Sequence, residues 1–231
     1  ARAYGIRGVG AIAPGYKADM VLLEDLKDFK VKQVISRFGR PYTGEEQIPS
    51  PILPPQVFNS VRLPEISKAD LALKCHVSAP VIKMIPHQLV TELVYRDVER
   101  DENGCFIPGS GMVKLAVIER HHATGSMAVG ILEGLGIKHG AVASTVAHDS
   151  HNLVVAGDND EDMLMAIESL RECGGGYSVV SRGVVLARLP LPIAGLMTAA
   201  PVNDVLEIQQ ALLDALYSLG AKRDSDPLIA L

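Results

Sequence analysis

The chain has 231 residues, and its 22 Lys and Arg against 27 Asp and Glu give a formal net charge of −5 at pH 7. Hydrophobic residues make up 48% and charged residues 21%, a balance that excludes a disordered or low-complexity chain. An acidic chain with only 4% aromatic residues offers neither a basic stripe for phosphates nor platforms for base stacking. We therefore expect no nucleic-acid partner.

The chain also lacks the sequence signs of a membrane or secreted protein. No apolar run reaches the roughly 18 residues of a membrane-spanning helix, and residues 1–7 do not have the pattern of a signal peptide. The three cysteines, Cys75, Cys105 and Cys173, are odd in number and far apart, which predicts reduced thiols. We expect a cytoplasmic protein, with further chain preceding Ala1 because residues 1–6 have the pattern of a helix end.

The first 40 residues have the pattern of a small β unit. Short runs over 8–12, 20–23 and 31–38 predict strands, and Pro14-Gly15 predicts a turn. This unit is too small to be stable alone. Residues 41–66 then hold six prolines with little periodicity, which predicts an extended connector and the main domain boundary.

Residues 67–231 predict a second domain of class α+β with a mostly antiparallel sheet. Helices are expected over 160–173, with Asp158 at its capped start and glycines 174–176 at its end, and over 202–219, where apolar residues form one stripe. Strands are expected over 81–85, 89–98, 112–119, 125–136, 140–147, 153–156, 177–180 and 184–189. The apolar segment 189–197 fits either the core or a contact with another domain.

Two polar clusters follow or precede apolar strands of this domain, where reactive side chains are commonly mounted. The first contains Glu119, Arg120, His121 and His122. In one interpretation an imidazole binds a polar substrate or acts as a general acid or base. In the other this is a charged strand end with a solvated Arg120 paired to Glu119.

The second cluster, His148-Asp149-Ser150-His151-Asn152, offers two imidazoles and a carboxylate, a donor set suited to a divalent metal ion. On an extended strand His148 and His151 would point to opposite faces, so a metal site formed by His148, Asp149 and His151 needs a tight turn. The alternative is that Asp149 caps a turn while the other side chains make ordinary hydrogen bonds. Since both clusters adjoin strands of one domain, neighbouring strand ends would favour a functional site.

Two stretches resemble a known family. Residues 10–21, with the pattern G-x-I-A-P-G-x-x-A-D-x-V, are similar to the segment by which hydrolases of the amidohydrolase superfamily re-enter a small β-sandwich beside their catalytic barrel. Residues 112–197, above all KLAVIERHHATG, GAVASTVAHDSHNLVVAG and LPLPIAGLM, resemble the C-terminal domain of bacterial and archaeal adenine deaminases.

The resemblance implies hydrolytic conversion of adenine to hypoxanthine and ammonia, in purine salvage, by a full-length enzyme with a binuclear manganese or iron centre in a (β/α)₈ barrel. Such a barrel takes typically about 250 residues, and its metal-binding H-x-H motif is absent from this sequence. The resemblance thus implies the end of a barrel and part of a composite β-sandwich over 1–40, the connector over 41–66, and the deaminase C-terminal domain over 67–231. No catalytic residue is assigned within this chain.

From the resemblance we expect a portion that braces or covers the barrel, is inactive alone, and has adenine, the missing barrel and further copies of itself as partners. The residues expected to face the active site are Glu119, His121, His122, His148, Asp149, His151 and Asn152. Two alternatives remain: a non-catalytic module for folding and oligomerisation, and an independent metal-binding domain centred on residues 148–151.

Overall fold

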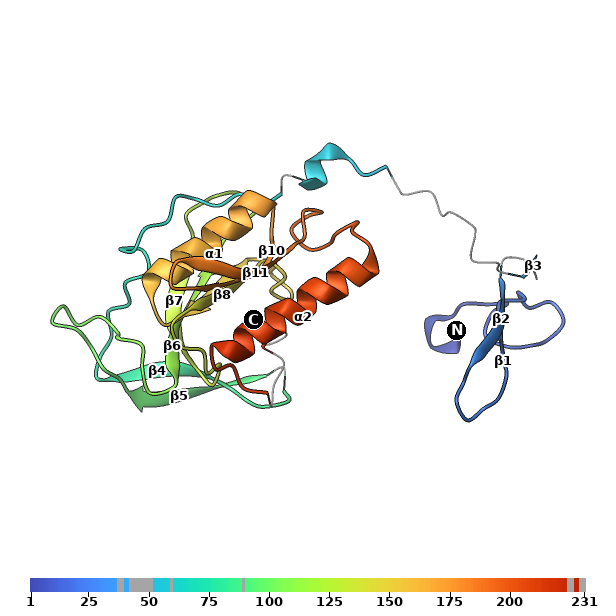
Figure 1. Ribbon diagram of the computed structural model, residues 1–231, viewed down its shortest axis with the longest axis horizontal. Helices are drawn as coiled ribbons and strands as arrows, with labels where there is room; N and C mark the ends of the chain where they lie inside the picture. Colours follow the sequence, from blue (N-terminus) through green and yellow to red (C-terminus); the bar gives the residue numbers. More distant parts are fainter. Residues whose placement is uncertain (37–39, 42–51, 59, 89, 224–226, 229–231) are drawn as a thin grey trace. The chain divides into compact units, whose positions relative to one another are not determined.

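The computed structural model describes residues 1–36, 40–41, 52–58, 60–88, 90–223 and 227–228 (Figure 1). They form two compact units, residues 1–52 and 53–231, and each is considered by itself. Among the described residues, no helix combines the length and the apolar character that a membrane crossing requires.

The first unit contains a short 3₁₀ helix, η1 (Arg2–Tyr4), and a small antiparallel sheet of β1 (Met20–Leu23), β2 (Val31–Ser36) and the two-residue β3 (Arg40–Pro41). The strand predicted over 8–12 does not form. Gly8 and Gly10 have φ values of 71° and 84°, a left-handed conformation that interrupts an extended chain. The predicted strand over 31–38 ends at Ser36, and its last two positions lie outside the described residues.

The second unit is built on one eight-stranded sheet with the order β11-β10-β8-β9-β6-β7-β4-β5. A 3₁₀ helix, η2 (Pro55–Phe58), precedes it. Its strands are β4 (Ser78–Met84), β5 (Thr91–Asp97), β6 (Met112–Ile118), β7 (Met127–Glu133), β8 (Ala141–Ser144), β9 (Leu153–Gly157), β10 (Gly176–Ser181) and β11 (Val184–Pro190). All neighbours are antiparallel except β4 and β7, so the predicted α+β class with a mostly antiparallel sheet is confirmed.

Helix α1 (Asp160–Cys173) has the predicted bounds. Its N-cap is Asn159 and not the predicted Asp158, because the Asn159 side chain accepts a hydrogen bond from the Asp162 amide at 2.8 Å. Asp158 instead accepts from the amides of His139 and Gly140. Gly174 ends the helix in a left-handed conformation, as its position after the last apolar residue predicts.

Asp162, in the first turn of α1, also fastens the β10–β11 hairpin. Its buried carboxylate accepts hydrogen bonds from the amides of Arg182, at 2.9 Å, and Gly183, at 2.8 Å, in the turn between the two strands. One side chain therefore joins the start of the helix to the end of the hairpin.

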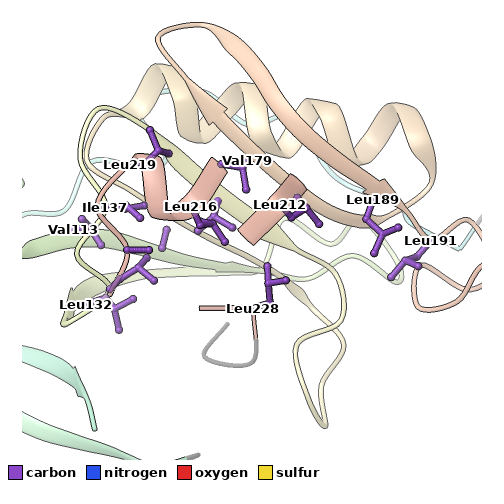
Figure 2. Packing of buried hydrophobic residues seen from close by; sticks show 14 residues of the cluster. Val113, Leu132, Ile137, Val179, Leu189, Leu191, Leu212, Leu216, Leu219 and Leu228 are labelled. Carbon is purple, nitrogen blue, oxygen red and sulfur yellow. The ribbon is translucent and has the colours of Figure 1, made fainter. Parts of the chain in front are cut away.

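The two helices cover opposite faces of the sheet. Alternate residues of a strand point to opposite faces, and Ala141 and Ala143 of β8 belong to the cluster that contains α1, whereas Val142 belongs to the cluster that contains α2. Figure 2 shows the cluster that contains α2 (Val202–Ser218), in which Leu212 and Leu216 lie against the sheet.

Segments before and after the strands complete these cores. Leu63 is buried in the α1 cluster, and the Arg171 guanidinium donates to the carbonyls of Leu63 and Pro64, both at 2.8 Å. In the segment 189–197, Leu191 and Ile193 are buried, so much of this apolar stretch serves the core.

The packing of α2 predicts a sharp contrast between two leucines of that helix. Leu216→Ala should lower the free energy of unfolding by about 2–5 kcal/mol, because Leu216 is completely buried. Leu206→Ala should change it by less than about 0.5 kcal/mol, because Leu206 is exposed. Urea denaturation followed by circular dichroism measures both, and equal effects would contradict the described position of α2.

Candidate functional site

The two polar clusters singled out in the sequence meet at one end of the sheet. Strands β6 and β9 are neighbours, and Ile118 at the end of β6 pairs with Leu153 at the start of β9. Loop A, residues 119–126, therefore leaves the sheet beside loop B, residues 145–152. The His121 ring links them, since its Nε2 lies 3.1 Å from the Ser150 carbonyl oxygen.

Arg120 is the buried centre of this region, which corrects the interpretation of a solvated strand end. Its side chain is 1% exposed and makes no ion pair with Glu119 or any other described carboxylate. The guanidinium donates instead to the carbonyls of His151 at 2.5 Å, Ala194 at 3.2 Å and Thr145 at 3.4 Å. Burial without a counter-ion lowers the pKa of Arg120.

Two of the three carbonyls that bind Arg120 belong to residues with strained backbone. His151 and Ala194 have φ values of 50° and 59°, in the left-handed region that side chains other than glycine seldom adopt. Asp149 in loop B and Ala123 in loop A share this conformation, with φ values of 69° and 53°. Left-handed residues cost about 1–3 kcal/mol each and persist where their surroundings hold them, and a cationic donor on two of their carbonyls supplies such a hold.

A glycine makes room for the guanidinium. A Cβ atom at Gly195 would lie 2.8 Å from Arg120 Nη1, closer than such contacts allow. The Gly195 carbonyl accepts a hydrogen bond from the Thr145 hydroxyl at 2.6 Å, which links the segment 189–197 directly to loop B. Arg120 links them a second time, because it donates to carbonyls in both. Arg120 Nη1 itself is buried and has no hydrogen-bond partner among the described residues.

Glu119 organises its own loop. Its carboxylate accepts from the amides of His121 at 2.5 Å, His122 at 2.8 Å and Thr124 at 3.0 Å, and also from the Thr124 hydroxyl at 3.0 Å. The Thr124 amide is the largest cause that lowers the pKa of Glu119 to about 2, and burial opposes it. A carboxylate with these bonds is a loop cap and a poor general base.

The histidines of loop A differ in exposure. His121 is half-buried, and its Nε2 faces the Ser150 carbonyl oxygen, to which a proton on that nitrogen donates. His122 is exposed, and its Nδ1 lies 3.6 Å from Glu119 Oε1. The two rings lie edge to face, with centroids 6.4 Å apart.

Loop B does not gather the three donors predicted to bind a metal. His148 and Asp149 are paired through Nδ1 and Oδ1 at 3.1 Å, with side chains 95% and 91% exposed. His151 is half-buried, and its ring Nδ1 is buried and has no partner in the described part of the chain. Over all described residues, no group of three or more His, Cys, Asp and Glu side chains is arranged to hold a metal ion. Asn152 is half-buried, and its backbone N–H donates to the Ser150 hydroxyl at 3.3 Å.

Sequence reasoning missed the importance of Arg120, Thr145 and Ala194. One signal was present: alternation along β6 puts position 120 on the same face as Ala116 and Ile118, which are buried in the α1 cluster. Nothing local indicated that carbonyls 25 and 74 residues away would accept from this guanidinium.

Arg120 should be far more important to stability than its exposed neighbour Arg62. Arg120→Met keeps much of the side-chain volume but removes the donors to three carbonyls, so we expect a loss of about 2–4 kcal/mol in the free energy of unfolding. Arg62→Met, which alters an exposed side chain, should change it by less than about 0.5 kcal/mol. Urea denaturation measures both changes. If Arg120→Met were as stable as the parent chain, the stabilising role of the Arg120 hydrogen bonds would be disproved.

Loop A should loosen only in strong acid. The pKa of Glu119 is lower in the folded state than the ordinary value of 4.5, so its stabilising bonds are complete above pH 4.5 and are lost as the pH falls towards about 2. The NMR shift of the Thr124 amide should follow this titration, with a midpoint near 2. A midpoint near 4.5, or no shift change in Glu119→Gln relative to the parent, would contradict the described bonds.

Comparison with known proteins gives a consistent result. The family model of the adenine deaminase C-terminal domain matches residues 88–231. An adenine deaminase of Nitratidesulfovibrio vulgaris is 46% identical over 236 residues, which cover 100% of this chain and 41% of the relative. Adenine deaminase 2 of Carboxydothermus hydrogenoformans is 45% identical over 96% of this chain and 40% of its own length.

A more distant relative agrees. An adenine deaminase of Bacillus pumilus is 40% identical over 100% of this chain and 41% of its own length. The chain thus spans about two fifths of the length of the curated relatives it matches. Both loops and the segment that carries Ala194 lie inside the range matched by the family model. The chain belongs to the adenine deaminase C-terminal domain family.

Proposed function

We propose that this chain is the C-terminal portion of a cytoplasmic adenine deaminase of purine salvage, which converts adenine and water to hypoxanthine and ammonia. The support is that full-length relatives at 46% and 45% identity bear this name and match the chain over nearly its whole length. The chemistry requires the remaining part of such an enzyme, so we expect the chain by itself to be inactive.

Within that enzyme, the face made by loops A and B covers the active site. The observation that carries this proposal is the hydrogen bonding of Arg120, which holds loops A and B together at one end of the sheet. The imidazoles of His122 and His148 stay exposed to the solvent. Strained, well-held loops next to exposed polar groups are typical of functional surfaces.

The exposed groups suit recognition of a purine. The His148 side chain is 95% exposed, and its Nδ1 lies 3.1 Å from Asp149 Oδ1. In the neutral ring with the proton on Nδ1, Nε2 is an acceptor. Such a nitrogen can accept a hydrogen bond from an amino group or a ring N–H of a purine. His122, also exposed, offers a second imidazole on the same face.

The first unit is proposed to be part of a composite β-sandwich that braces the barrel. Its sheet leaves apolar side chains exposed, among them Val21, Leu22 and Val31. Apolar residues on a three-stranded sheet of this size are stabilised when further strands cover them. The same exposure also favours the alternative of a folding and oligomerisation module, in which the loops would have no part in substrate binding.

The described residues do not fit the binuclear manganese or iron centre that the family implies, because no three donors converge. We therefore assign no metal ligand to this chain and expect the metal centre in the barrel portion. A separate metal-binding domain centred on residues 148–151 has no support from the positions of its side chains.

Histidine substitutions in a full-length adenine deaminase that contains this chain test the proposal. His148→Ala and His122→Ala should each reduce kcat/KM for adenine about tenfold or more, which is typical for the loss of a hydrogen bond made to a substrate. The measurement is the rate of hypoxanthine formation with the metal-loaded enzyme.

His76→Ala is the matched control, since His76 is exposed in the same unit and distant in sequence from both loops, and it should leave kcat and KM unchanged. If the His148 and His122 variants had wild-type kinetics, these loops would not bind substrate, and the folding and oligomerisation module would be the remaining interpretation. Hypoxanthine formation by the 231-residue chain alone would contradict the need for a barrel.

A further inference from the structure

Strand β5 is a regular edge of the eight-stranded sheet, and among the described residues no further strand pairs with it (Figure 1). It pairs with β4 from Ser78↔Asp97 to Met84↔Thr91 in one continuous register, without a bulge and without Gly or Pro within β5. Natural edge strands are usually interrupted by such devices. The opposite edge has them: the β10–β11 register shifts at Val179, and β11 ends at Pro190.

The backbone of β5 is oriented to receive another strand. The Val98 amide donates to the Val77 carbonyl at 2.8 Å, just beyond the end of the β4–β5 ladder. Because hydrogen-bonded pairs alternate along an antiparallel ladder, the even-numbered residues of β5 bond to β4. The N–H and C=O groups of the odd-numbered residues therefore point away from the sheet; these are Thr91, Leu93, Tyr95 and Asp97.

The sequence of this edge is complementary to itself. If two β5 strands pair antiparallel around Val94, Glu92 lies opposite the partner's Arg96, and Leu93 lies opposite the partner's Tyr95. Both opposite-charge pairs and both apolar pairs are favourable cross-strand neighbours. Moving the axis to Leu93 or Tyr95 would set one of the charged residues opposite Val94 instead.

The surroundings reinforce this register. Within one chain Lys83 Nζ lies 3.2 Å from Glu92 Oε2, and Arg96 Nε lies 3.0 Å from Glu133 Oε2. Pairing around Val94 would extend these pairs into a row of alternating charge, from Lys83 and Glu92 to the partner's Arg96 and Glu133. On the other face of β5, Leu93 and Tyr95 are 71% and 66% exposed and would gain apolar cover.

We propose that β5 binds β5 of a second copy of this chain, antiparallel around a two-fold axis at Val94. The contact is isologous, since the same strand serves both subunits. It joins the two sheets into one and removes an exposed edge from each. We assign a second copy as the binding partner because, in an antiparallel pair of β5 strands, Glu92 of each strand lies opposite Arg96 of the other.

Two charge reversals, tested apart and together, examine the register. Sedimentation velocity of the parent 231-residue chain should show a concentration-dependent dimer of twice 24.7 kDa. Glu92→Arg and Arg96→Glu should each raise the dimer Kd at least about tenfold, because two attractive pairs become two repulsive ones. An equimolar mixture of the two variants should dimerise again, because each strand then finds the opposite charges on the other.

Each outcome decides the proposal. Glu102→Arg changes the charge by the same amount in an exposed turn of this unit and should leave the Kd unchanged. The recovery in the mixture also proves that both variants fold. A parent chain that stays monomeric, a dimer insensitive to both reversals, or a mixture that fails to associate would overturn the pairing, and the edge would then belong to another occupant.

Discussion

The described part of the second unit depends on a buried cation that has no counter-ion. Arg120 can stay inside only if carbonyl oxygens replace water around its guanidinium, and those oxygens come from Thr145, His151 and Ala194. Two segments far apart in the sequence, loop B and residues 189–197, must therefore close around one side chain. The left-handed backbone at His151 and Ala194 and the missing side chain at Gly195 follow from that requirement.

Much of the fold could be predicted because its signals are local. The bounds of α1 follow from a polar residue before the apolar spacing and a glycine after it. Short continuous apolar runs predict the central strands β6, β8 and β9, which are buried at nearly every position. Residues 8–12 do not form the predicted strand, because Gly8 and Gly10 adopt left-handed conformations that are incompatible with an extended strand.

The site was harder to predict than the fold. Neighbouring strand ends were a correct guide, because Ile118 and Leu153 pair directly. The chemistry of single residues is not predictable from the sequence, since it depends on backbone conformation. Loop B has left-handed residues at Asp149 and His151, and its donors do not converge. The amides around Glu119 make this residue, which was expected to face the active site, a cap of its own loop. A sequence pattern lists the donors but not the directions in which the chain points them.

The Asp162 carboxylate, which caps the β10–β11 turn from the first turn of α1, has a consequence for the order of folding. Its contacts span 20 and 21 residues of chain, whereas the bonds from Arg171 to Leu63 and Pro64 span 108 and 107. Short loops cost less entropy to close, and contacts of low sequence separation form fast. The helix and its hairpin can thus assemble as a local nucleus, onto which the preceding strands and the segment around Leu63 are added later.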